Sequence, residues 1–249
     1  YLAGEKENIH AWAAWMNIRA NHYWYSGQRD SAMMQFKAVF QHQDPQILNR
    51  RAAASVNLGA LYNIKGMRDS ALFFLSHARE MFSELGDEAG LSRVDYSLGI
   101  QYVYRDNYEM ALRHYLQSLE YQEREKDTFA LVYSYNTIGN IFLKQRNAEK
   151  ALEFYNRALA LDMAFDRLNH RSSIYNNISS VYLDYLGDID KAEEFALLGI
   201  GESESVNYNS VLFYLYSNLG SVNLMRGNFR EALRYNLLAA ETSDQLVPF

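Results

Sequence analysis

The chain has 249 residues, 49% of them hydrophobic, so it can bury a substantial core and does not have the composition of a disordered segment. Its two prolines are compatible with long helices, and the absence of cysteine excludes disulfides, thiolate metal sites and cysteine nucleophiles. The formal net charge of −6 argues against a surface that follows nucleic-acid phosphates, because such surfaces are rich in Lys and Arg.

A phrase of about ten residues recurs along the chain. It is written "GQRDSAMMQF", "GMRDSALFFL", "DNYEMALRHY", "RNAEKALEFY", "GDIDKAEEFA" and "GNFREALRYN". Its alanines lie 39 to 41 residues apart, at Ala32, Ala71, Ala111, Ala151, Ala192 and Ala232. A fixed period of this length is the signature of a repeat architecture. We therefore expect 1–249 to form a single repeat domain, with repeats at approximately 6–43, 46–85, 88–125, 128–165, 168–204 and 207–245.

Upstream of each phrase, a small residue is followed three positions later by an aromatic one. The pairs are Ala20 and Tyr23, Gly59 and Tyr62, Gly99 and Tyr102, Gly139 and Phe142, Ser179 and Tyr182, and finally Gly220 with Asn223 in place of the aromatic residue. A small residue at a fixed helical position lets a neighbouring helix approach closely, and the aromatic ring fills the space beside it. Each repeat is thus predicted to be two helices packed as a hairpin.

Short turns with helix-start chemistry separate the two predicted helices. Side chains suited to capping a helix N-terminus stand at Asn107, Asn147, Asp188 and Asn228. Glycines that can break the first helix stand at Gly27, Gly66, Gly187 and Gly227. Carboxylates follow in the first turn of the second helix, where a negative charge interacts favourably with the helix dipole. They are Asp30, Asp69, Glu109, Glu149 and Asp190. Their recurrence indicates a helix-start role for these acids and argues against catalysis.

The pattern of a small residue, an aromatic three later and an alanine about nine after that resembles the tetratricopeptide repeat (TPR) family. The resemblance covers nearly the whole chain, although the family's common repeat has 34 residues and this one has about forty. It implies an all-α fold, a right-handed α-solenoid (superhelix) of six TPR-like helix-turn-helix repeats. It also implies a concave groove that is lined by the first helices and holds an extended peptide or partner segment. The longer repeats are similar to those of bacterial regulators and sensor arms.

Asparagines recur on the first helices, where the resemblance implies a groove. An amide offers donors and an acceptor to an extended peptide backbone, as in the asparagine ladders of peptide-binding TPR proteins. Alternatively, these amides tie one helix to the next or contact water. The residues expected to line the groove are Asn17, Asn21, Asn57, Tyr96, Asn136, Asn140, Asn176, Asn177 and Asn218.

Aromatic side chains accompany the amides. Trp24, Tyr25 and Tyr133 are expected in the groove, because phenol and indole rings supply contact area together with a polar group. By contrast, Tyr135, Tyr175 and Tyr216 occupy a column in which the family places a packing aromatic, and we expect them in the core.

The sequence predicts a non-catalytic module without a cofactor or metal. The histidines show no paired metal spacing, and neither a phosphate-binding glycine loop nor a nucleophile elbow occurs. The cationic positions of the family's clamp for acidic chaperone tails are mostly neutral, so that partner is not expected. The chain is interpreted as the sensing or scaffolding fragment of a larger bacterial regulatory protein, in the periplasm or alternatively the cytoplasm, without a membrane span of its own. The alternatives are a solenoid that binds a glycan or polar small ligand, and an architectural module that forms homo-oligomers through uncapped repeat ends.

Overall fold

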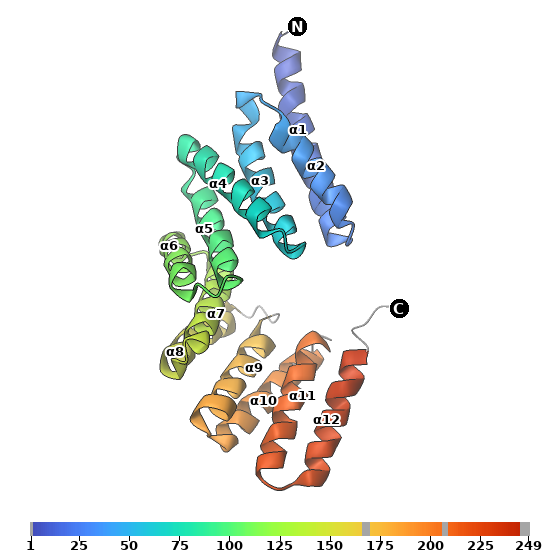
Figure 1. Cartoon of the computed structure of the whole chain (residues 1–249), viewed down its shortest axis with the longest axis vertical. Helices are drawn as coiled ribbons and strands as arrows, with labels where there is room; N and C mark the ends of the chain where they lie inside the picture. Colours follow the sequence, from blue (N-terminus) through green and yellow to red (C-terminus); the bar gives the residue numbers. More distant parts are fainter. Residues whose placement is uncertain (1, 166–169, 206–208, 245–249) are drawn as a thin grey trace. The chain divides into compact units, whose positions relative to one another are not determined.

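The computed structural model describes residues 2–165, 170–205 and 209–244, with side chains at 9–165, 170–203 and 211–243. Helices dominate these residues, and no strand occurs among them (Figure 1). The expected repeat bounds at 168, 207 and 245 lie outside the described residues. By contact, the chain divides into two compact units, unit 1 (Tyr1–Glu125) and unit 2 (Lys126–Phe249).

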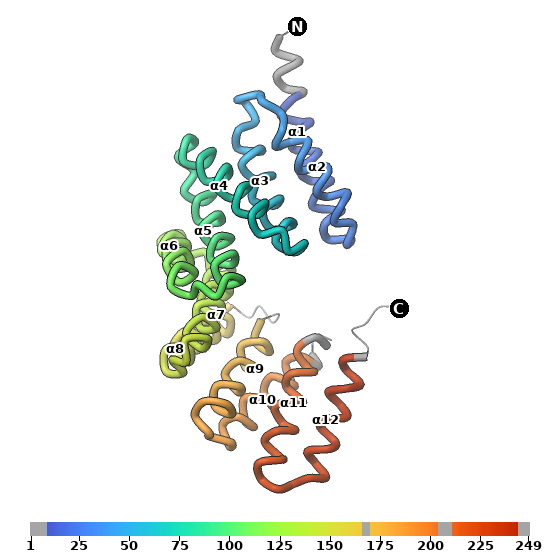
Figure 2. Tube along the Cα trace, viewed as in Figure 1, coloured from blue at the N-terminus to red at the C-terminus, as the bar shows by residue number. Residues whose placement is uncertain are grey.

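Unit 1 consists of three helix hairpins. In the Cα trace of Figure 2 the chain reverses direction at the turn within each pair. A short 3₁₀ turn, Pro45–Ile47, leads from the first hairpin to the second, and Asp44 caps it by accepting a hydrogen bond from the backbone N–H of Gln46. The helices are α1 (Leu2–Tyr25), α2 (Arg29–Gln41), α3 (Leu48–Ile64), α4 (Arg68–Leu85), α5 (Glu88–Val103) and α6 (Tyr108–Glu125).

Unit 2 repeats the same arrangement over its described residues. Its helices are α7 (Thr128–Lys144), α8 (Ala148–Phe165), α9 (Arg171–Val181), α10 (Ile189–Ser205), α11 (Asn209–Met225) and α12 (Phe229–Asp244). A π turn, Tyr182–Leu186, extends α9, and it contains the residue by which the fifth repeat is longer than its neighbours. Helices α9, α10, α11 and α12 lie side by side in Figure 1, with α12 at one edge of the group. The expected all-α architecture of helix-turn-helix repeats is therefore confirmed.

The recurring small residues act where the two helices of a hairpin cross. A Cβ atom built on Gly139 would lie 2.5 Å from the ring of Tyr155, and one on Gly99 would lie 2.8 Å from the ring of Tyr115. Both rings are almost completely buried. Since Tyr115 and Tyr155 each follow the repeat alanine by four residues, the two halves of the sequence pattern meet at one contact.

The turn inside each hairpin places one residue in the left-handed region of backbone space. Four repeats use glycine, as expected, but the third and fourth use Asp106 (φ 54°) and Arg146 (φ 59°). Helix capping offsets the cost of this conformation at the two non-glycine residues. The next residues, Asn107 and Asn147, accept hydrogen bonds from backbone N–H groups three residues further on. Asp188 caps α10 in the same way.

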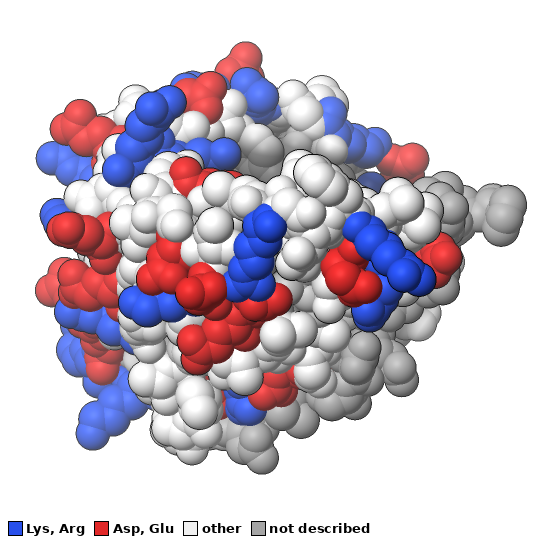
Figure 3. Space-filling model, turned by 90° about the horizontal axis from the view of Figure 1, so that it is seen from below, with Lys and Arg blue, Asp and Glu red and all other residues white. Residues whose placement is uncertain are grey.

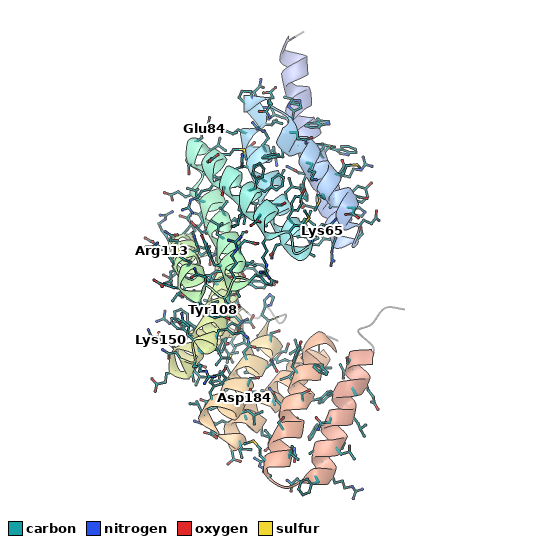
Figure 4. The ribbon with its side chains drawn as sticks, in the orientation of Figure 1. Lys65, Glu84, Tyr108, Arg113, Lys150 and Asp184 are labelled. Carbon is teal, nitrogen blue, oxygen red and sulfur yellow. The ribbon has the colours of Figure 1, made fainter. Side chains whose placement is uncertain are left out.

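The acids in the first turn of the second helices have a role that the sequence pattern did not show. Three of these acids each form an ion pair with a cation at the end of the next repeat's first helix, 35 or 36 residues later. Figure 4 labels one of these cations, Lys65, next to the turn that follows α3. The pairs are Asp30 with Lys65, Asp69 with Arg105, and Asp190 with Arg226. Each pair connects two consecutive repeats of one unit. The ammonium group of Lys65 lowers the pKa of Asp30 by hydrogen bonding and by its charge.

Candidate binding face on the first helices

In unit 2, the first helices carry one repeated stripe of neutral polar side chains. The positions are i, i+3, i+4 and i+7, which share one face of a helix. We call this stripe the neutral strip; it consists of Tyr133, Asn136, Thr137 and Asn140 on α7, Ser173, Asn176, Asn177 and Ser180 on α9, and Tyr214, Ser217, Asn218 and Ser221 on α11. All twelve side chains are exposed or half-buried, and none is charged.

Charge is nearly absent from these three helices as a whole. Lys144 ends α7, Arg171 starts α9 and is buried, and α11 has no charged residue. The second helices carry the charges instead, for example Glu149, Lys150 and Glu153 on α8. A ligand on the neutral strip would thus contact hydroxyl and amide groups, and the strip offers it no charged side chain for an ion pair.

The strip's asparagines connect consecutive first helices. The Asn177 amide donates to Oδ1 of Asn136 at 2.9 Å, which joins α9 to α7. The Asn218 amide donates to Oδ1 of Asn176 at 3.3 Å and lies within reach of the Ser180 hydroxyl at 3.2 Å, which joins α11 to α9. The bridging role that the sequence left open is therefore present.

These bridges leave part of each amide's hydrogen-bonding capacity unused. Among the described residues, neither Nδ2 of Asn136 nor Oδ1 of Asn177 has a partner, and both side chains are half-buried. Asn140 is exposed, and its Oδ1 accepts a 2.6 Å hydrogen bond from the hydroxyl of Tyr155. An amide with one fixed hydrogen bond is oriented, and its remaining donors or acceptor can meet a ligand without an added ordering cost.

The groove residues expected in unit 1 do not form a comparable stripe. Asn17 is buried and donates to the backbone carbonyl of Arg50 at 3.4 Å, so it links α1 to α3. Trp24 packs edge-on against Phe36 in the core of the first hairpin. The remaining expected residues are Asn21 and Tyr25, which are exposed, Asn57, which is half-buried, and Tyr96, whose ring packs against Tyr115.

The three tyrosines expected in the core pack against rings of second helices. Tyr175 is buried and lies near Phe195, with ring centroids 6.1 Å apart. Half-buried Tyr135 and Tyr216 make similar contacts with Phe154 and Tyr235.

An aromatic cluster that the repeat pattern did not predict lies at one end of the neutral strip. The ring of Tyr133 lies 4.1 Å from that of His170 and 5.1 Å from that of Phe129, centroid to centroid. Phe129 and Tyr133 are partly exposed, so the cluster can offer an apolar contact to a ligand. The available signal was the spacing of Phe129 and Tyr133 by four residues on α7.

Burial lowers the pKa of His170, and the charge of Asp162 opposes this effect in part. The neutral imidazole is therefore favoured in the fold, and its contribution to stability is present above pH 6.5 and lost as the pH falls through the lowered pKa. We expect the wild type to lose more unfolding free energy than His170→Gln between pH 7 and pH 5, as measured by urea denaturation at each pH. Parallel losses in the two proteins would contradict this assignment.

A buried ionic network holds α8, α9 and α10 together. Arg171 donates to Oδ2 of Asp162 and to Oε1 of Glu202, each at 3.0 Å. The Asp162 side chain is almost fully buried and that of Arg171 is 11% exposed. The repeat pattern did not predict this network, and its one signal is that Arg171 stands where the repeats on either side have Leu131 and Leu212. Because both carboxylates bond the same guanidinium and join three helices, the network has a structural role.

Other kinds of site find no support in the described part of the chain. No group of three His, Asp or Glu side chains there is placed to hold a metal ion. Within the same residues, no helix combines the length and apolarity that crossing a bilayer requires. On the face that Figure 3 displays, basic and acidic side chains are interspersed, which does not favour binding to nucleic-acid phosphates.

Comparison with known families gives a match to the tetratricopeptide repeat model at residues 90–164 and 128–197. The matched segments together span 90–197, from α5 into α10. A comparison with curated protein sequences finds no match.

Solved structures share the fold at low sequence identity. BtubC from P. vanneervenii superposes with a TM-score of 0.73 at 18% identity, covering 90% of this chain and 91% of that one. A signal transduction ATPase with a tetratricopeptide repeat sensor, from Pyrococcus horikoshii, gives 0.73 at 16% identity and covers 92% and 41%. A Rap protein complexed with competence and sporulation factor gives 0.70 at 11% identity and covers 98% and 80%. The fold is thus that of tetratricopeptide α-solenoids.

Proposed function

We propose that the chain, whose residues 90–197 match the tetratricopeptide repeat model, is a non-catalytic binding module that holds an extended, uncharged peptide segment on the neutral strip. The observation that carries this proposal is the strip itself, with twelve amide, hydroxyl and phenol side chains at matching positions of three successive helices. Repeats along a solenoid present equivalent groups at regular intervals, and an extended main chain presents its N–H and C=O groups at regular intervals too.

The similar structures support a sensing role for the whole protein. One of them contains a tetratricopeptide repeat sensor, and another was determined with competence and sporulation factor bound. We propose that this chain, too, is the ligand-recognising part of a larger bacterial regulatory protein. Among the groove residues expected in unit 1, Asn21, Tyr25, Asn57 and Tyr96 remain proposed as ligand contacts of that unit, because their side chains are exposed or half-buried. Asn17 and Trp24 have packing partners instead.

Replacing Asn136 and Asn140 together with alanine tests the strip directly. Each substitution removes one hydrogen bond within the protein, so the free energy of unfolding should fall by no more than about 2 kcal/mol. Binding should weaken by about tenfold or more, because two oriented amides are lost from the strip. The probe is a neutral, N-acetylated and C-amidated peptide selected from a display library on the wild-type chain. Fluorescence anisotropy measures its affinity.

The matched control is Asn156→Ala, on the exposed face of α8 and outside the strip. It should leave the affinity unchanged and raise the free energy of unfolding only by the gain in helix propensity, about 0.5 kcal/mol. Unchanged affinity in the double variant would exclude the strip as the peptide site. If the library yields no binder while neutral oligosaccharides bind and lose affinity in the double variant, the ligand is a glycan and the peptide proposal is wrong.

A further inference from the structure

Helix α12 carries an apolar stripe on the side that faces away from α11. Ala232 and Ala239 are buried, whereas Leu233 and Leu237 on the opposite side are 61% and 56% exposed. The residues that line this side follow the spacing i, i+3, i+4, i+7, i+8 and i+11 of a helix-packing face: Arg230, Leu233, Arg234, Leu237, Leu238 and Glu241. Such a face is suited to a partner helix.

The charges and leucines of this stripe match those of an identical stripe that runs in the opposite direction. When two copies of α12 are laid antiparallel about a twofold axis between positions 235 and 236, position n of one copy meets position 471 − n of the other, where 471 is twice 235.5. Arg230 then lies opposite the partner's Glu241, and Leu233 lies opposite the partner's Leu238. Because the axis generates every pair twice, one register gives two ion pairs at the rims and two leucine pairs nearer the axis.

Arg234 is compatible with this register. In each copy it bonds Glu231 at 2.8 Å and its guanidinium lies over the ring of Tyr235, so its charged head is already held to one side. Its aliphatic stem lies opposite the partner's Leu237 and can cover that side chain while the head stays hydrated. No like charges face each other across the axis.

We propose that α12 is a self-association surface, on which a second copy of this chain packs its own α12 in antiparallel orientation. The charge order favours a second copy, because the basic start and the acidic end of the stripe are brought together only when the partner helix has the same order and the opposite direction. A single pair of helices buries less area than a standard interface, so the dimer should be weak and concentration-dependent.

Sedimentation equilibrium of the wild-type chain, from micromolar to hundreds of micromolar, should show a reversible monomer–dimer equilibrium. Arg230→Glu and Glu241→Arg each place like charges opposite one another twice, so each should weaken dimerisation by about tenfold or more. The double variant R230E/E241R reverses both charges and should recover most of the wild-type affinity. Circular dichroism checks that every variant is folded.

Glu109→Arg, on the exposed start of α6, is the matched control and should dimerise as the wild type does. A wild-type chain that stays monomeric over the whole range overturns the proposal. Dimerisation that is insensitive to the single charge reversals assigns the contact to another surface. A double variant as weak as the singles excludes the antiparallel register. None of these outcomes depends on peptide binding at the neutral strip.

Discussion

Replacement of Arg171 with alanine is expected to lower the free energy of unfolding of unit 2 by about 3–5 kcal/mol. Arg171 is the shared partner of Asp162 and Glu202, at 3.0 Å from each, and Asp162 is almost fully buried. Without the guanidinium, a carboxylate remains in a poorly hydrated site and must either stay charged without a partner or take up a proton. Urea denaturation followed by circular dichroism measures the loss.

Two further variants separate charge from packing. Arg171→Lys keeps the charge but cannot form the two-pronged contact, so its loss should be intermediate. The double variant R171L/D162L replaces the most buried pair with apolar side chains of similar volume, and it should recover a large part of the stability that Arg171→Ala loses. Leucine already occupies the position of Arg171 in the repeats on either side. A loss below about 1 kcal/mol in Arg171→Ala would show that the network is hydrated and energetically minor.

Replacement of Gly139 with alanine is expected to lower the free energy of unfolding by about 1–3 kcal/mol, although alanine is intrinsically the better helix former. The added methyl group would lie 2.5 Å from the ring of Tyr155, which is completely buried and whose hydroxyl is bonded to Asn140. The ring has no room to retreat, so α7 and α8 must move apart. Thermal and urea denaturation of the variant measure this cost.

Gly201 provides the matched control, because it lies in a helix too but a Cβ atom there would meet nothing within 4 Å. Gly201→Ala should therefore raise the free energy of unfolding by about 0.5–1 kcal/mol through helix propensity alone. Opposite signs for the two substitutions are the expected result. A stabilising effect at Gly139 would contradict the close crossing of α7 and α8.

The repeat architecture could be predicted from sequence because its signals are redundant. The small residue and the alanine recur about every forty residues, and the aromatic residue accompanies them in five of the six repeats. These signals agree with one another because they belong to the same helix hairpin. The contact between Gly139 and Tyr155 is an example, because the buried ring fits between the helices only when the residue facing it has no side chain. These requirements act within one hairpin, between helices that are neighbours in the sequence, so they recur with the period of the repeat.

Other features depend on partners that a periodic pattern does not identify. Asn136 and Asn177 belong to different columns of the repeat and are 41 residues apart, so their hydrogen bond follows from how α7 and α9 pack. Arg171 occurs once, where neighbouring repeats have leucine, and only its proximity to Asp162 and Glu202 explains it. The neutral strip could be predicted in part, since Asn136, Asn176 and Asn218 were identified, whereas Ser173 is placed beside them by the structure alone.

The π turn at Tyr182–Leu186 bears on how such arrays change in length during evolution. The fifth repeat carries an extra residue, yet Ala192 is fully buried and the ring of Tyr182 stacks on that of Phe195, as the ring of Phe142 stacks on that of Phe154 at the equivalent positions of the fourth repeat. The wider turn absorbs the insertion before the second helix begins, and the hairpin core keeps its register. A single-residue insertion at such a turn can therefore be accommodated without compensating changes in the repeats that follow.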